Sequence, residues 1–183
     1  MSFIATHKYT RGKRFLWLLL VAVIALLVFV NLPKPDSLTV LPGFVLETHD
    51  GVVIDSTELA GRPMVITLWA PWCPFCINEL AKLAQMQYEF ADEVVIMAVV
   101  RSGDKQSSRD FAESVGVLGD LIFLVDPDDL IYDAVRAKGL PTTLFVREDG
   151  TYYKHNTPID LAVIRASIRE LTTTATASVG DAL

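Results

Sequence analysis

Residues 72–76 read WCPFC, and this short stretch decides the fold, because it holds the only two cysteines of the 183-residue chain. Two thiols separated by two residues can close a small disulfide and reopen it. The apolar run at residues 64–70 predicts a buried strand before the pair, and a helical pattern from Pro74 to about Phe90 follows it. The pair therefore lies at a strand-to-helix turn, which is typical of a redox-active dithiol.

The two cysteines are expected to have different roles. Cys73 stands where a helix N-cap would lie, with Pro74 at the first helical position, where its missing N–H costs nothing. Free backbone N–H groups and the helix dipole favour a thiolate there, so we expect Cys73 to be the nucleophile. Cys76 shares a helical stripe with Leu80 and Leu83, which predicts an inward-facing, resolving thiol. A static disulfide or two inert thiols are the alternative.

The rest of the chain predicts an α/β fold with a mixed central sheet flanked by helices. The Asp-Gly pairs at residues 50–51 and 149–150 predict two hairpins. The predicted strands are 44–47, 52–54, 64–70, 94–100, 121–125, 143–147 and 151–154, and the predicted helices are 56–60, 74–90, 105–115, 130–138 and 159–171.

The N-terminal part predicts a membrane anchor. Residues 15–32 form an apolar run close to the length that spans a bilayer, and the basic segment 1–14 before it is predicted to be cytoplasmic. A cleaved signal peptide is the alternative. Residues 33–41 are predicted as a tether, 42–172 as the folded domain and 173–183 as a flexible tail.

The charge balance argues against nucleic acid as a partner. The chain carries 16 basic and 22 acidic residues, and four of the basic ones lie in the segment before the apolar run. The part after the anchor is therefore strongly acidic, with no electrostatic reason to bind nucleic acid or an anionic membrane surface.

Two motifs resemble a known family. The stretch WAPWCPFC at residues 69–76 resembles the active-site segment of thioredoxin-fold proteins, and GLPTTLF at 139–145 is similar to their cis-proline loop. Together with the anchor and an added helix and strand between Val100 and Asp126, they resemble the TlpA/ResA/DsbE-like group of membrane-tethered thiol–disulfide oxidoreductases. This resemblance covers roughly residues 41–171 and implies a thioredoxin-like fold with an N-terminal β-hairpin and a central insertion.

The resemblance also implies roles for residues outside the dithiol. It implies that Pro141 is cis and packs against the disulfide, which leaves the Leu140 backbone free to pair with a substrate strand. Thr67 replaces the buried Asp of thioredoxins, so another group must accept the proton of Cys76. Glu79, one helical turn after Cys76, matches an acidic residue of ResA-like proteins, and a solvated surface Glu is the alternative.

Three residues beside the dithiol are expected to contribute to the surface that contacts substrates. These are Trp72, Pro74 and Phe75. Phe75 cannot stabilise a thiolate as the His of strongly oxidising relatives does, which predicts an intermediate reduction potential.

The resulting hypothesis is a periplasm-facing oxidoreductase, anchored in a bacterial inner membrane through residues 15–32. Its expected partners are exported cysteine-containing proteins, including apocytochromes, and a membrane thiol electron donor. We expect no cofactor besides the Cys73–Cys76 disulfide and no metal, because His49 and His155 are single residues near turns, predicted to be solvated. Two alternatives stay open: Cu(I) handling by the same dithiol, and a thiol peroxidase, which would prefer a Thr at the position of Ala70.

Overall fold

The computed structural model describes residues 16–23 and 39–180. The chain divides into two units, Met1–Ser37 and Leu38–Leu183. In the first unit, residues 16–23 form a helix with exposed side chains. The rest of the predicted anchor 15–32, the basic segment 1–14 and the first part of the tether lie outside the described residues. Among the residues described, no helix has both the length and the hydropathy that crossing a membrane requires.

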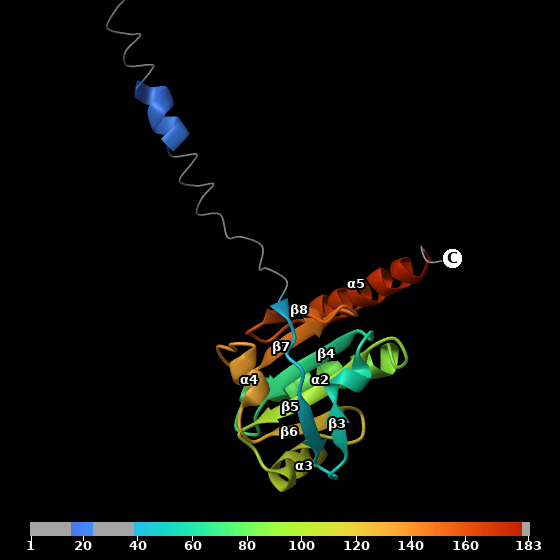
Figure 1. Ribbon diagram of the computed structural model, residues 1–183. Coiled ribbons are helices and arrows are strands. Elements are labelled where there is room, and N and C mark those ends of the chain that lie inside the picture. The colour runs from blue at the N-terminus through green and yellow to red at the C-terminus, as the bar shows by residue number, and fades with distance from the viewer. Residues whose placement is uncertain (1–15, 24–38, 181–183) are drawn as a thin grey trace, which may run out of the picture. The chain divides into compact units, whose positions relative to one another are not determined.

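The second unit is built on one mixed sheet of eight strands in the order β1-β8-β7-β4-β5-β6-β2-β3 (Figure 1). The strands are β1 (Thr39–Val40), β2 (Val45–Thr48), β3 (Val53–Asp55), β4 (Met64–Trp69), β5 (Val95–Arg101), β6 (Ile122–Asp126), β7 (Thr142–Val146) and β8 (Thr151–His155). The central strands β4, β5 and β6 run parallel to one another, and β7 pairs antiparallel to β4. The predicted α/β class, mixed sheet and N-terminal hairpin are confirmed.

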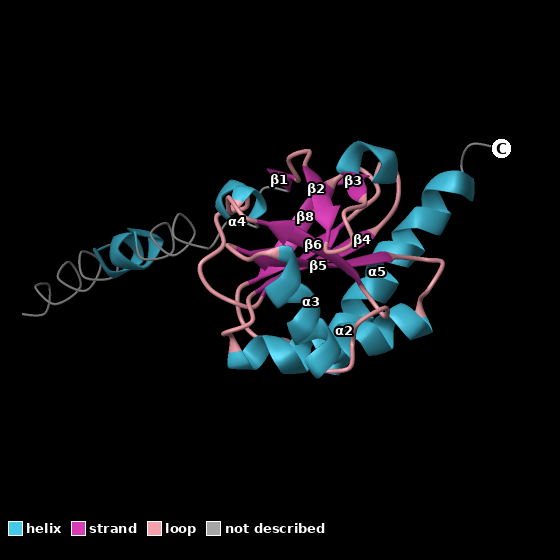
Figure 2. Cartoon of the chain, turned by 90° about the horizontal axis from the view of Figure 1, so that it is seen from below, coloured by secondary structure: helices cyan, strands magenta, loops and turns pink. Residues whose placement is uncertain are grey.

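Helices cover both faces of this sheet (Figure 2). One face carries α2 (Pro74–Glu89), α3 (Lys105–Ser114) and α5 (Leu161–Gly180), and the other carries the short α4 (Leu130–Ala134) and the 3₁₀ turn η1 (Ser56–Leu59). The helix and strand predicted between Val100 and Asp126 are α3 and β6, and β6 extends the sheet on one side of β5.

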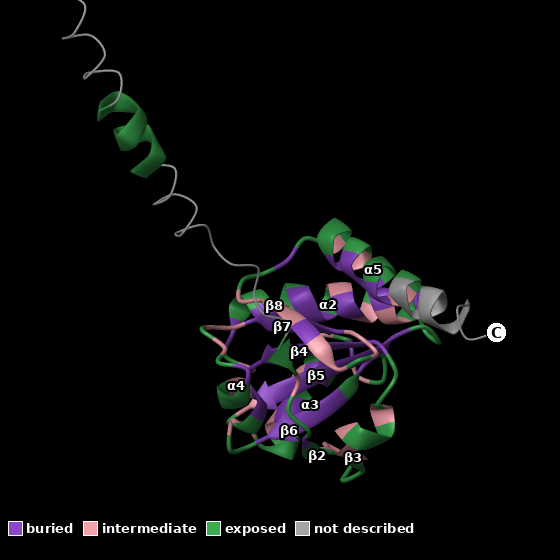
Figure 3. Ribbon diagram, turned by 45° about the horizontal axis from the view of Figure 1, so that its top comes forward, coloured by how far each residue is buried: buried purple, intermediate pink, exposed green. Residues whose placement is uncertain are grey.

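Alternation along the central strands produces two separate cores. Val65 and Ile96 point to the α2 face, while their neighbours Ile66 and Met97 point to the α4 face. Every residue of β4 is buried, as are all but the last of β5 (Figure 3). This double burial explains why both strands are continuous apolar runs in the sequence.

The helix predicted at 130–138 is shorter than expected, because α4 ends at Ala134. Arg136 has a positive φ of 50°, which lies outside the helical region and stops the helix. Lys154 of β8 donates to the carbonyls of Val135 and Arg136, and so binds the backbone at this helix end.

Two further elements differ from the predicted boundaries. The last helix, expected to end at Leu171, continues to Gly180, so residues 173–180 of the predicted tail are helical. The apolar stripe therefore did not identify the residue at which α5 ends. The strand β1, which pairs antiparallel with β8, lies within the segment 33–41 that was predicted as a tether.

Candidate active site

The two cysteines form a disulfide at the point where β4 passes into α2, with their Cα atoms 5.4 Å apart. Cys73 is the N-cap of α2 in an extended conformation, and Pro74 occupies the first turn, as predicted. The chain reverses through a turn in which the Cys73 N–H donates to the Ala70 carbonyl at 3.0 Å. Both sulfurs therefore lie at the positive end of the α2 dipole.

Burial differs sharply across this turn. Cys76 is fully buried in the α2 core, as predicted, while Cys73 retains 4% exposure. Trp72 and Phe75 are 71% and 62% exposed, so both aromatic rings lie on the surface beside the dithiol.

The proline loop lies at the end of the sheet from which the redox turn emerges. The peptide bond between Leu140 and Pro141 is cis, which confirms the prediction. β7 begins at Thr142, which pairs with Leu68 of β4. This register places Pro141 beside the carboxyl end of β4, from which the redox turn emerges.

Glu79 is buried, with 1% exposure, so the alternative of a solvated surface carboxylate is wrong. The Thr143 hydroxyl lies 2.6 Å from its Oε1 atom, and the Ile159 N–H donates to its Oε2 atom at 2.9 Å. The Thr67 hydroxyl lies 3.1 Å from that of Thr143, so the residue that replaces the thioredoxin Asp joins the same network. An acidic group is thereby held one helical turn after Cys76.

A second set of hydrogen bonds near the proline loop was not predicted. The Asn156 Oδ1 atom accepts from the Lys138 N–H at 3.2 Å and lies 3.2 Å from the Thr142 hydroxyl. That hydroxyl also lies 2.8 Å from the Gly139 carbonyl oxygen. An Asn directly after a strand looks like an ordinary turn residue, so the sequence carried no signal for these contacts.

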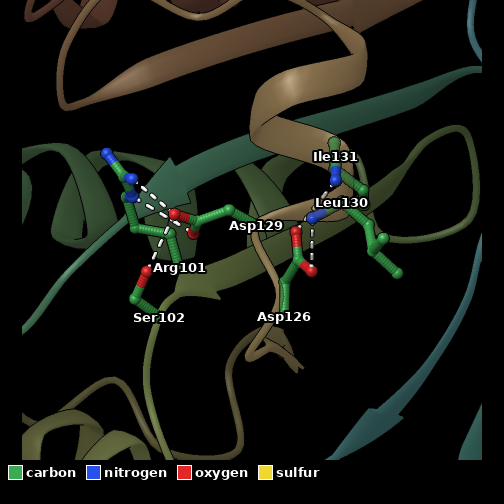
Figure 4. Close-up of polar contacts among 6 residues, drawn as sticks. All are labelled: Arg101, Ser102, Asp126, Asp129, Leu130 and Ile131. Atoms are coloured by element: carbon green, nitrogen blue, oxygen red, sulfur yellow. Dashed lines mark hydrogen bonds and ion pairs between the residues drawn. The ribbon is translucent and has the colours of Figure 1, made fainter.

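A charged cluster that was not predicted lies where β5 and β6 end (Figure 4). Because β4 runs parallel to both strands, this is also the end of the sheet from which the redox turn emerges. Arg101 forms a bidentate ion pair with Asp129, and its guanidinium stacks over the Tyr132 ring, 3.8 Å from the centroid. The hydrogen bond from Arg101 lowers the pKa of Asp129. The cluster thus fixes the start of α4 to the end of β5.

Asp126 completes this cluster, and among the residues that the structure describes no cation forms an ion pair with it. It is fully buried and accepts from the Leu130 and Ile131 N–H groups at 2.8 and 2.9 Å. Burial raises its pKa despite these two bonds. Its position at the N-terminus of α4 indicates a structural role in starting that helix.

The histidines do not match the expectation of two solvated side chains. His49 is largely buried, with Nε2 3.2 Å from an Asp50 oxygen and its ring edge against Phe123. His155 is partly buried, with its ring edge against Phe145. Among the described residues, no three His, Cys, Asp or Glu side chains gather as a metal ligand set.

The chain is similar to a known protein family and to known proteins. The AhpC/TSA family matches residues 39–154. The thiol-disulfide oxidoreductase ResA of Bacillus subtilis is 30% identical over 114 residues, which make up 62% of this chain and 63% of ResA. The soluble secreted antigen MPT53 of Mycobacterium tuberculosis is 27% identical over 138 residues, which make up 75% of this chain and 78% of that protein.

A solved structure is similar as well. It is the crystal structure of a secreted Mycobacterium tuberculosis disulfide oxidoreductase homologous to E. coli DsbE. It superimposes with a TM-score of 0.64 and 26% sequence identity, over 70% of this chain and 96% of that one. Thiol–disulfide oxidoreductases with a thioredoxin-like fold are thus among the proteins similar to this chain.

Proposed function

The chain belongs to the AhpC/TSA family, and on this premise we propose that it is a thiol–disulfide oxidoreductase acting on exported proteins through Cys73 and Cys76. The single observation that carries the proposal is the disulfide at the N-terminus of α2, with one cysteine slightly exposed and the other fully buried. Two-step exchange needs a resolving thiol that lies deeper than the attacking one, and Cys76 lies deeper than Cys73.

The reaction runs as two successive displacements at sulfur. The Cys73 thiolate attacks one sulfur of a substrate disulfide, which forms a mixed disulfide and releases the first substrate thiolate. The Cys76 thiolate then attacks Sγ of Cys73, which re-forms the Cys73–Cys76 disulfide and releases the second substrate thiolate. Two electrons pass to the substrate, whose thiolates take up two protons, and a thiol donor must reduce the protein before the next cycle.

In this proposal Glu79 is the group that accepts the proton of Cys76. It lies one turn further along α2, buried and held by Thr143 and the Ile159 backbone. In this proposal its carboxylate accepts the Cys76 proton when that thiol becomes the attacking group. The exposed rings of Trp72 and Phe75, with the main chain of Leu140, form the surface against which the substrate lies.

The cellular setting is part of the proposal. The basic segment 1–14 followed by the apolar run 15–32 supports an anchor in a bacterial inner membrane, with the folded domain in the periplasm. Relatives whose names include the word secreted support an extracytoplasmic domain. A membrane thiol donor would supply electrons, and apocytochromes are one class of exported substrate.

The reduction potential of the full chain tests this function. The protein is equilibrated in thiol buffers of defined potential, and the redox state is followed by thiol alkylation and by fluorescence. A value of about −250 mV favours a reductase, and a value of about −150 mV favours an oxidant or isomerase. Trp72→Phe serves as a control, because it should reduce the fluorescence change and leave the alkylation curve in place.

A matched pair of variants tests the order of the two steps. Cys76→Ser should accumulate a mixed disulfide with a protein substrate, while Cys73→Ser should form none. Absence of any reversible Cys73–Cys76 couple in the wild-type chain would overturn the proposed function. Stoichiometric Cu(I) binding by the reduced protein, lost in Cys73→Ser, would then favour copper handling.

A further inference from the structure

We propose that Asn156 is a positioning residue for substrate binding, because it fixes the turn that presents the Leu140 main chain. We call residues 138–142 the proline turn. Asn156 comes directly after β8, and its Oδ1 atom contacts both ends of this turn, at the Lys138 N–H and at the Thr142 hydroxyl. The inference rests on the proposed function and extends it to a residue outside the two motifs.

Within the part of the chain that the structure describes, the side-chain hydrogen bonds to the proline turn involve the hydroxyl of Thr142 and the amide of Asn156. The Thr142 hydroxyl lies 2.8 Å from the Gly139 carbonyl, so the turn closes on itself, and Asn156 then joins that hydroxyl to the Lys138 N–H. Removing the Asn156 amide would leave the Lys138 N–H without this acceptor. The turn would stay attached to the sheet through β7, but it would lose the hydrogen bond that fixes Lys138 at its other end.

The same segment reaches α2 three residues later. Ile159 is buried, its N–H donates to Glu79, and its carbonyl accepts from Lys82 Nζ at 2.6 Å. Residues 156–159 therefore connect the proline turn to α2, the helix that contains Cys76 and is capped by Cys73. This connection keeps the position of the proline turn fixed relative to Cys73.

A fixed turn matters only for a substrate that has a backbone. A protein that presents its disulfide on an extended segment can pair with the Leu140 main chain, and a pre-ordered turn lowers the entropy cost of that pairing. A small dithiol such as dithiothreitol has no peptide groups and gains nothing from the turn. Asn156 is therefore expected to affect exchange with proteins and not exchange with small thiols.

Two single-turnover rates test the inference with the full chain. The first is the oxidation of the reduced protein by insulin, whose disulfides lie in a polypeptide. The second is the reduction of the oxidised protein by dithiothreitol. Asn156→Ala should slow the first by roughly three- to tenfold, as expected for one lost hydrogen bond, and leave the second unchanged. Asn156→Asp keeps an oxygen at this position and should restore most of the insulin rate.

Controls separate this role from a general loss of structure. Thr157→Ala changes the exposed neighbour in the same segment and should leave both rates unchanged. Equal slowing of both reactions by Asn156→Ala, or no slowing of either, would overturn the inference. Failure of the wild-type chain to exchange with dithiothreitol would instead overturn the proposed function, and this inference with it.

Discussion

Replacing Thr143 with valine is the sharpest test of the buried network around Glu79. The substitution keeps the shape of the side chain and exchanges its hydroxyl for a methyl group. Thr143 is fully buried, and its hydroxyl contacts both Glu79 at 2.6 Å and Thr67 at 3.1 Å. The change therefore removes two polar contacts without creating a cavity.

The expected loss follows from these two contacts. A hydrogen bond to a charged group contributes about 1.5–3 kcal/mol, and a buried hydroxyl left without its partner costs about 1 kcal/mol more. Burying the added methyl group returns about 0.8 kcal/mol. We expect Thr143→Val to lower the free energy of unfolding by about 2–3 kcal/mol, which corresponds to a urea midpoint about 1–2 M lower.

Urea unfolding of the oxidised protein measures this change, with Thr57→Val as the matched control. The Thr57 hydroxyl also lies close to a carboxylate, Oδ1 of Asp55 at 2.7 Å, but the pair is on the surface. Thr57→Val should therefore shift the urea midpoint far less than Thr143→Val does. A double-mutant cycle with Glu79→Gln should give a coupling of about 1 kcal/mol or more. Equal midpoints for the two Thr variants, or strictly additive effects in the cycle, would refute the reasoning.

Three further predictions concern the core, the ion pair and the buried acid. Trp69→Ala should lower the free energy of unfolding by about 3–5 kcal/mol, because this ring is fully buried, whereas Trp72→Ala should change it by less than about 0.5 kcal/mol, both by urea unfolding. Arg101→Lys should cost about 1–2 kcal/mol in thermal unfolding, since lysine reproduces neither the bidentate bond nor the stacking on the ring. Burial raises the pKa of Asp126, so the folded protein holds this proton more tightly than the unfolded chain, and the group's contribution to stability is lost as the pH rises above 3.8. Asp126→Asn should flatten that decline at pH values above 3.8, and an unchanged slope would contradict a raised pKa for Asp126.

The redox turn could be predicted from sequence because its causes are local. An apolar run buried on both faces gives β4, and a cysteine followed by a proline gives the start of α2. The two Asp-Gly hairpins follow from turn chemistry in the same way. The cis form of Pro141 came only from the resemblance of its loop to a known motif.

The unpredicted contacts depend on residues far apart in the sequence. Glu79 is buried because Ile159, 80 residues later, places a backbone N–H against it. Helical periodicity did not identify which polar side chain would be covered by such a segment. His49 looked like an exposed turn residue for the same reason, since its burial depends on Phe123 of β6. The pairing of β1 with β8 likewise joins segments more than 100 residues apart.

The sheet order has a mechanical consequence. β1 lies at one edge of the sheet and the β2–β3 hairpin at the other, so residues 41–44 cross the face between them, with Phe44 buried against the α4-side core (Figure 1). A pulling force on the N-terminus would therefore act first on the two-residue pairing of β1 with β8. It would then separate residues 41–44 from the face of the sheet that carries α4. The redox helix packs on the opposite face. We expect tension along the N-terminal chain to loosen the packing on the α4 side of the domain and to leave the packing around Cys73 and Cys76 unchanged.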